Sequence, residues 1–177
     1  MEEQHWFALK VFYNKIPQLA KEFIADNIEI YVAYEKVATV RKGVKKIVTR
    51  PIIASLMFFR STDAKAVEIQ SKLGNRALVY TRKEGQNRVP VRIPDRQMNI
   101  FMLVCSSGQD GLEYYGAGGS DFSKGDYVRV TGGPFEGAEG HVVRIKGSRR
   151  LVVSIEGVCA IATSYIPNCF LMKLPPP

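Results

Sequence analysis

The stretch FSKGDYVRVTGGPFEGAEGHVVRIKGSRRLVVSI, residues 122–155, decides the fold of the carboxy-terminal part of the chain. Three runs within it, GDYVRV, GHVVRI and RLVVSI, are rich in β-branched residues, as strands are. A fourth run, CAIATSYI, follows, and the tight turns KGSR and EGVC join the later runs. Short, closely spaced strands with little helix predict a small β-barrel over residues 123–177.

The turn TGGPFEG, residues 131–137, carries an apolar ring where water is expected. A phosphate-binding loop is disfavoured, because no helix and no GK[ST] follow these glycines. Two interpretations of Phe135 remain: it plugs one end of the barrel, or it faces outward and a partner covers it. A partner that covers an exposed ring would gain roughly 1.5–3 kcal/mol of apolar burial.

The first hundred residues predict a mixed α/β unit. Proline at position 17 suits the first turn of a helix, and Leu19, Ala20, Phe23 and Ile24 follow at helical spacing. The remaining expected elements are a strand over 5–12, strands between 28 and 60 with a basic hairpin-like stretch at 41–50, a helix from 62 to 73, a strand pair over 76–83 and 89–93, and a helix opened by Pro94-Asp95.

Residues 105–122, CSSGQDGLEYYGAGGSDF, break this pattern. Glycine and serine are dense and the hydrophobic periodicity is lost, which predicts a flexible linker. The expected organisation is therefore an α/β domain over residues 1–104, a linker over 105–122 and a β-barrel domain over 123–177.

The chain carries a formal net charge of +8, and its sequence pI is near 9.5. The basic excess lies mostly in residues 1–104 and includes RKGVKKIVTR, residues 41–50. This balance favours an acidic partner such as nucleic acid.

No constellation for catalysis is readable in the sequence. His5 and His141 fall in different predicted domains, and no Ser-His-Asp, Cys-His or HExxH pattern occurs. Three cysteines without a CxxC pair predict reduced thiols and no zinc site. We expect no enzymatic activity, no cofactor and no metal. The acidic start and the lack of a long apolar run predict a cytoplasmic, membrane-free protein, which we expect to be a monomer.

The order of parts resembles the NusG family of transcription elongation factors, whose amino-terminal NGN domain is followed by a KOW domain. The resemblance is strongest in residues 122–155, with their Gly-Asp turn, G-P-F, and glycines 137 and 140. It implies an α+β fold, in which an antiparallel sheet with helices precedes an SH3-like KOW barrel. The sequence VPVRIPDRQMNIFM, residues 89–102, and the KOW motif are similar to those of UpxY-type antiterminators of polysaccharide operons.

In that family the first domain receives the clamp helices of the largest RNA polymerase subunit. The resemblance implies that Trp6, Phe7, Ile53, Leu56 and Phe58 bind polymerase through an apolar depression. The alternative is that these side chains are core, since strand residues alternate between two faces. Where the family commonly has P-G-Y, this chain has Ala54-Ser55-Leu56, a departure at the polymerase-binding depression.

Two further surfaces are expected to bind partners. Basic side chains would track the phosphates of displaced non-template DNA or nascent RNA; they are Arg41, Lys42, Lys45, Lys46, Lys72 and Arg76. The alternative is an ordinary solvated face. In the family the G-P-F loop binds Rho or a small-subunit ribosomal protein, and the matching positions are Gly133, Pro134, Phe135 and Gly137.

These observations predict a transcription elongation or antitermination factor, specialised for polysaccharide-type operons. It would bind RNA polymerase through the first domain and a second protein through the barrel. A ribosome- or RNA-binding KOW protein is the alternative, because KOW barrels also occur in ribosomal proteins and the net charge suits RNA. An enzyme with an unrecognised active site is a third hypothesis.

Overall fold

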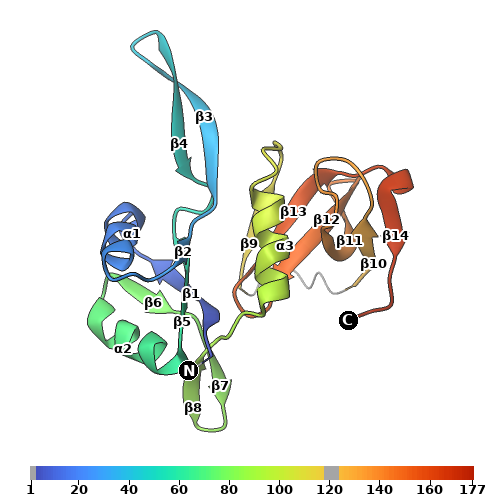
Figure 1. Cartoon of the computed structure of the whole chain (residues 1–177). Coiled ribbons are helices and arrows are strands. Elements are labelled where there is room, and N and C mark those ends of the chain that lie inside the picture. Colours follow the sequence, from blue (N-terminus) through green and yellow to red (C-terminus); the bar gives the residue numbers. More distant parts are fainter. Residues whose placement is uncertain (1–2, 118–123) are drawn as a thin grey trace. The chain divides into compact units, whose positions relative to one another are not determined.

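The computed structural model describes residues 3–117 and 124–177 of the chain. It divides into two compact units, Met1–Arg92 and Ile93–Pro177, and each is described by itself (Figure 1). The first unit contains a sheet with two helices and two separate hairpins, and the second is mostly β-structure.

The first unit is built on a four-stranded antiparallel sheet in the order β2-β5-β1-β6. Its strands are β1 (His5–Val11), β2 (Ile30–Tyr31), β5 (Leu56–Ser61) and β6 (Ala77–Val79). The central strands β1 and β5 are almost continuously buried, as the unbroken apolar run before Arg60 predicts. This sheet confirms the antiparallel architecture expected for the first domain.

Two helices, α1 (Ile16–Ala25) and α2 (Asp63–Leu73), contribute to the core on one face of this sheet. Pro17 lies in the first turn of α1, and the Thr62 side chain accepts a hydrogen bond from the Lys65 amide to cap α2. Phe59 lies at the centre of the core, because its ring contacts Phe7 and Phe23, each with centroids 5.5 Å apart.

Two hairpins form their own two-stranded sheets outside that core. One joins β3 (Tyr34–Arg41) to β4 (Val44–Pro51), and the other joins β7 (Thr81–Glu84) to β8 (Asn87–Pro90). In the β3–β4 turn, Lys42 and Gly43 both have positive φ, 52° and 77°. Two positive φ values match the right-handed twist of the flanking strands, so the turn favours a long, regular hairpin.

The second unit contains a six-stranded antiparallel sheet in the order β14-β10-β11-β12-β13-β9. Its strands are β9 (Glu113–Gly116), β10 (Tyr127–Val130), β11 (Glu139–Ile145), β12 (Ser148–Ile155), β13 (Cys159–Tyr165) and β14 (Leu171–Lys173), with a 3₁₀ turn at Asn168–Phe170 before β14. The four strands expected from the sequence are β10 to β13. The β-rich carboxy-terminal fold is therefore confirmed.

Two features of the second unit differ from the expected domain limits. Helix α3 (Asp95–Cys105) was assigned to the first domain, but it packs on β12 within the second unit. Strand β9 lies within the expected linker 105–122, and it pairs with β13. Residues 118–122 of that linker lie outside the described part of the chain. This strand was not predicted, because glycine and serine are dense around it, although Tyr114 and Tyr115 are good strand formers.

Candidate interaction surfaces

The sheet of the first unit has two different faces. The strand register places Trp6 opposite Arg60 and Ala8 opposite Phe58, so these side chains share one face. The alternate residues, including Phe7, belong to the core that α1 and α2 cover. Both helices of this unit contribute to that core, which leaves the face with Trp6, Leu56 and Phe58 without a helix of its own unit.

Phe7 does not share a face with the other strand residues expected to bind polymerase. Its side chain is fully buried and stacks on Phe59 within the helix-covered core. One position along a strand reverses the side-chain direction, so Phe7 points away from the face that carries Trp6. The structure therefore places Phe7 on the opposite face of the sheet from Trp6, Leu56 and Phe58. The expected polymerase-binding residues do not form a single surface.

The remaining expected residues are also buried. The exposed fractions are 4% for Trp6, 3% for Leu56 and 1% for Phe58. Ile53 lies in the turn before β5 and is likewise buried.

One end of the same face is already exposed. Leu78 lies opposite Lys10 on the edge strand β6, and 48% of Leu78 is accessible. Lys10 in turn lies opposite Leu56, so the three side chains form one row across the sheet. The sequence reading missed Leu78, although its position between the core residues Ala77 and Val79 is the signal of an outward strand residue.

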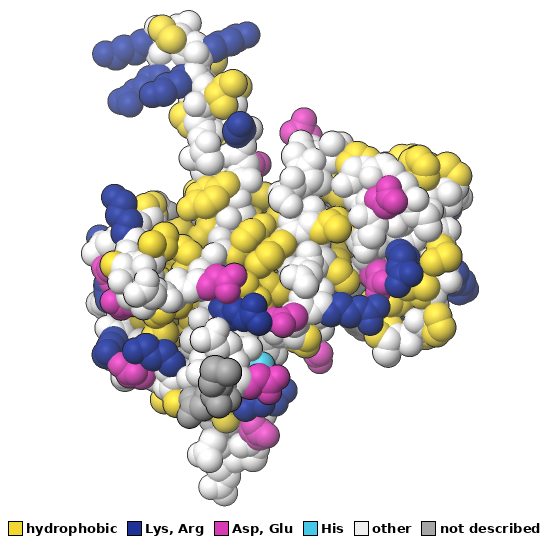
Figure 2. All heavy atoms as spheres, in the orientation of Figure 1, with side chains coloured by type: hydrophobic (Ala, Val, Ile, Leu, Met, Phe, Trp, Pro, Cys, Tyr) yellow, Lys and Arg dark blue, Asp and Glu magenta, His cyan; other side chains and the backbone are white. Residues whose placement is uncertain are grey.

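The basic residues at the end of the β3–β4 hairpin are exposed as a group. They are Arg41, Lys42, Lys45 and Lys46. Figure 2 shows Lys and Arg side chains gathered at this tip, with hydrophobic side chains between them. Within residues 3–117 and 124–177, no ion pair involves any of the four. Their charges are therefore available to an anionic partner.

Lys72 and Arg76 belong to a different environment. Arg76 Nη1 donates to both carboxylate oxygens of Glu22, at 2.9 and 2.8 Å. Lys72 pairs with Glu68 one turn earlier on α2, and the hydrogen bond to Glu68 raises the pKa of Lys72. Both cations thus have carboxylate partners, and the six expected basic residues do not form one uniform cluster.

Phe135 folds inward, which corrects the expectation that it faces a partner. Only 4% of the side chain is exposed. The loop closes on itself: the Gly137 amide donates to the Val130 carbonyl at 2.9 Å, and the Ala138 amide donates to the Phe135 carbonyl at 3.0 Å. Gly133 and Gly137 have φ values of 80° and 88°, which favour glycine. These two glycines shape a turn that buries the ring, so Phe135 is part of the core.

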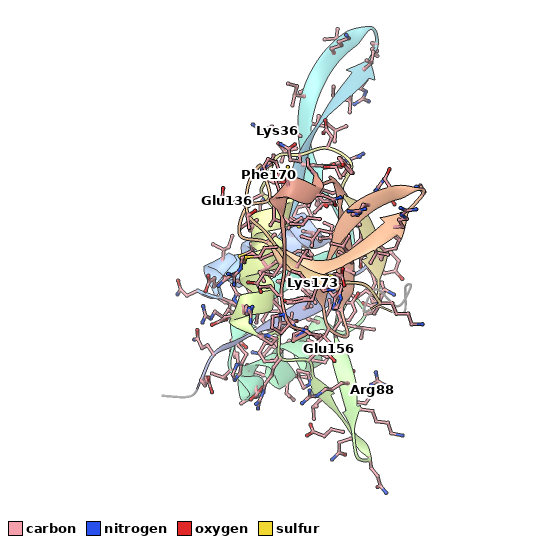
Figure 3. All side chains as sticks on the ribbon, turned by 90° about the vertical axis from the view of Figure 1, so that its right-hand side faces the viewer. Lys36, Arg88, Glu136, Glu156, Phe170 and Lys173 are labelled. Carbon is pink, nitrogen blue, oxygen red and sulfur yellow. The ribbon has the colours of Figure 1, made fainter. Side chains whose placement is uncertain are left out.

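A different ring, Phe170, lies against the outside of this loop. A Cβ atom placed on Gly132 would lie 3.0 Å from Phe170 Cδ1, and one on Gly133 would lie 3.4 Å from Cε2. The Thr131 amide also donates to the Phe170 carbonyl at 2.8 Å. Phe170 remains 36% exposed. Figure 3 labels it on the 3₁₀ turn before β14. The sequence reading missed this ring, for which the paired glycines leave room.

Glu139 joins helix α3 to the barrel. Its nearly buried carboxylate accepts hydrogen bonds from Arg129, at 2.8 and 2.6 Å, and from Arg96 of α3. Burial by itself would raise the pKa of Glu139, but the hydrogen bonds and charges of Arg129 and Arg96 outweigh burial and lower it. The carboxylate therefore stays ionised and holds two cations at the junction of α3, β10 and β11.

Two further contacts join α3 to the barrel, one near each end of the helix. The Glu156 amide donates to the Gln97 side-chain oxygen at 3.3 Å. At the other end of the helix, a Cβ placed on Gly137 would lie 3.7 Å from Leu103 Cδ1. A groove of about 470 Å³ between α3 and β10–β12 is lined by Ile100, Tyr127 and Val152 among others. The helix thus reaches the same loop that carries Phe135.

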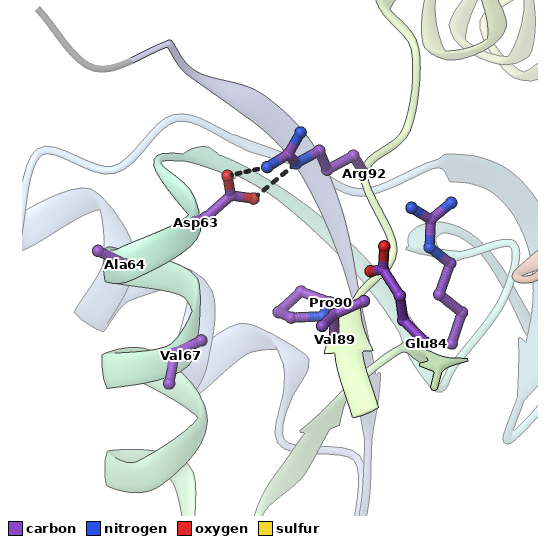
Figure 4. A pocket seen from close by; sticks show the side chains of 8 residues that line it. Asp63, Ala64, Val67, Glu84, Val89, Pro90 and Arg92 are labelled. Carbon is purple, nitrogen blue, oxygen red and sulfur yellow. Dashed lines mark hydrogen bonds and ion pairs between the residues drawn. The ribbon is translucent and has the colours of Figure 1, made fainter. Parts of the chain in front are cut away.

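The first unit contains a cavity of about 330 Å³ between α2 and the β7–β8 hairpin (Figure 4). At its edge Arg92 donates two hydrogen bonds to Asp63, at 2.9 and 2.5 Å. The hydrogen bond from Arg92 lowers the pKa of Asp63. Because this carboxylate and this guanidinium already bind each other, the cavity gives little support to a small-molecule site.

The chemistry-bearing side chains are scattered. Cys105 and Cys159 are buried and Cys169 is exposed, all as free thiols, and burial raises the pKa of Cys105 to about 12. Among the described residues, no group of three or more His, Cys, Asp or Glu side chains is placed to hold a metal ion. No helix in the described part of the chain is long and apolar enough to cross a membrane.

The fold defines a two-part protein, in which an α/β domain with an antiparallel sheet precedes a small KOW-type β-barrel. The chain belongs to the NusG family: the family model described as transcription termination factor nusG matches residues 4–102, more than half of its length. A KOW motif matches residues 124–156. The family match includes most of α3, the helix that packs on the barrel.

Comparison with solved structures finds a chain described as "Domain interaction in Thermotoga maritima NusG". The two share 16% identity, the match covers 98% of each chain, and the TM-score is 0.45. A comparison with curated proteins gives no match.

Proposed function

We propose that this protein is a transcription elongation or antitermination factor that binds RNA polymerase through the first unit. Membership of the NusG family supports this role, and the observation that carries it is the apolar face with Trp6, Leu56 and Phe58. Neither helix of the unit contributes to that face, and its apolar side chains suit a contact with the clamp helices of the polymerase.

The exposed row of Leu78 and Lys10 is the entry point for this contact. A helix that packs on Leu78 would lie in the same row as Lys10 and Leu56. Apolar burial would supply the affinity, and Lys10 would favour an acidic rim on the partner.

A pull-down of purified RNA polymerase with the full chain tests the proposal. Leu78→Glu should weaken binding at least tenfold, because it places a charge in the apolar contact. Val67→Glu is the matched control, since Val67 is 57% exposed and lies on α2, which packs on the opposite face. The proposal fails if wild type does not bind, or if both variants lose binding equally.

The second partner would bind the barrel at the loop that carries Gly133 and Pro134. We place Phe170 at the centre of this surface in place of Phe135, because Phe170 is the ring that stays partly exposed there. The expected partner is a small-subunit ribosomal protein or Rho, and specialisation for polysaccharide-type operons is part of the same proposal. Phe170→Ala should abolish capture of the purified partner while leaving polymerase binding unchanged.

A ribosome- or RNA-binding role is the second candidate, favoured by the net charge of +8. Its affinity for bare RNA should fall steeply with salt, since phosphate contacts release counterions. Tight polymerase binding together with weak, salt-insensitive RNA binding would reject it.

A further inference from the structure

The β3–β4 hairpin has the form of an extended two-stranded arm. Each strand has eight residues, which corresponds to a length of roughly 26 Å at about 3.3 Å per residue. The hairpin is a separate sheet, and most of its side chains are exposed or only half-buried. It therefore carries side chains that the core of the first unit does not require.

Positive charge surrounds the end of this arm. The register pairs Val40 with Lys45, Arg41 with Val44 and Thr39 with Lys46. Directly opposed residues share a face and neighbours alternate, so Lys45 lies on one face while Arg41 and Lys46 lie on the other. An arm with cations on both faces is suited to a partner that has negative charge on both sides of it.

Exposed apolar side chains lie between these cations. The exposed fractions are 65% for Val40, 67% for Val44 and 71% for Ile47. The register places these three side chains in the part of the hairpin next to its turn, and Figure 2 shows hydrophobic side chains among the cations at this end of the arm. The arm thus combines cations that suit phosphates with compact apolar groups that suit base edges.

We propose that the β3–β4 hairpin binds double-stranded B-form DNA by entering a groove of the duplex. The major groove is about 12 Å wide and admits a two-stranded β-ribbon. In that position Arg41 and Lys46 face one wall of the groove, and Lys45 faces the other wall together with Val40 and Ile47, which share its face of the hairpin. The inference stands on the hairpin itself and does not require the polymerase contact proposed above.

The side chains of the arm favour a duplex over a single strand. Proteins that bind single strands stack successive bases on aromatic rings. Residues 35–50 contain no aromatic ring, and Tyr34 lies at the base of the arm. An RNA duplex fits less well, because its A-form major groove is deep and narrow. The composition therefore points to DNA and to its double-stranded form.

Fluorescence anisotropy with a labelled 20-base-pair DNA duplex tests the inference on the full chain. Replacing Arg41, Lys42, Lys45 and Lys46 by Gln should weaken binding about 100-fold at low salt and reduce the slope of log K against log salt by roughly 3–4. The control replaces Arg82, Lys83 and Arg88 of the β7–β8 hairpin by Gln and should leave affinity within about threefold. Thermal unfolding of both variants checks that the fold is intact.

A second variant separates groove insertion from simple charge attraction. Val40→Thr together with Ile47→Thr keeps every charge, so it should weaken duplex binding about fivefold or more without changing the salt slope. The inference is overturned if a 20-nucleotide single strand or an RNA duplex binds as tightly as the DNA duplex. It is also overturned if the control hairpin variant loses as much affinity as the tip variant. Unchanged polymerase capture by these variants would show that the function proposed above stands separately.

Discussion

The β3–β4 hairpin and the loop after β10 were both expected to face partners, but only the hairpin exposes the side chains concerned. The four cations at the hairpin tip are exposed, whereas Phe135 in the loop is 4% exposed. A cation without a partner resists burial because desolvation is costly, so sequence predicts its exposure well. A ring in a turn is stable inside whenever the turn can fold over it, so its place in the turn does not decide its direction.

The largest effect should come from Phe135→Ala. Removing a buried phenylalanine leaves a cavity and costs about 3–5 kcal/mol, so the barrel should lose most of its stability. Phe170→Ala is the control, and it should cost about 1 kcal/mol or less because that ring is 36% exposed. Hydrogen exchange of the β10–β13 amides in the full chain measures both. Equal protection in the two variants would contradict the assignment of Phe135 to the core.

The next effect concerns Glu139, which lies just after the same loop. Glu139→Gln removes the charge that holds Arg96 and Arg129, and it should destabilise the second unit by about 1–3 kcal/mol. Glu136→Gln is the matched control in the same turn, since Glu136 is exposed. Urea unfolding, followed by hydrogen exchange in the second unit, compares the two. A control as damaging as Glu139→Gln would show that the ion pairs contribute nothing.

The pH dependence of this contribution has a defined sign. The pKa of Glu139 is lowered in the folded protein, so its ion pairs stabilise the fold above the unfolded pKa near 4.5. The difference in stability between wild type and Glu139→Gln should be complete at neutral pH and should shrink as the pH falls through 4.5 toward the lower folded value. A difference that grows on acidification would contradict the lowered pKa.

The smallest effect is expected at the hairpin. Gln at Arg41, Lys42, Lys45 and Lys46 should change the free energy of unfolding by no more than about 0.5 kcal/mol, because these side chains contact no core. A thermal melt of the full chain measures this change. A large loss of stability would mean that the hairpin is part of the folded core, and it would remove the contrast with the loop after β10.

The sequence predicted most of the fold because its signals were local. The strand run before Arg60, the proline at position 17 and the Thr62 cap each act within one element. The candidate surfaces were harder, since strand alternation places Phe7 in the core while Trp6 points the other way. Phe170 could not be found locally, because it meets Gly132 only after β14 pairs with β10.

The contact between α3 and the barrel has a practical consequence for dissecting this protein. A carboxy-terminal fragment cut by sequence at residue 123 would lack α3, whose Arg96 pairs with Glu139, and β9, which pairs with β13. It would expose Val152, and the carboxylate of Glu139 would keep Arg129 as a partner but lose Arg96. A fragment that begins at Ile93 keeps both elements. Researchers who express the shorter piece should therefore expect aggregation that reflects the cut and not the biology of the barrel.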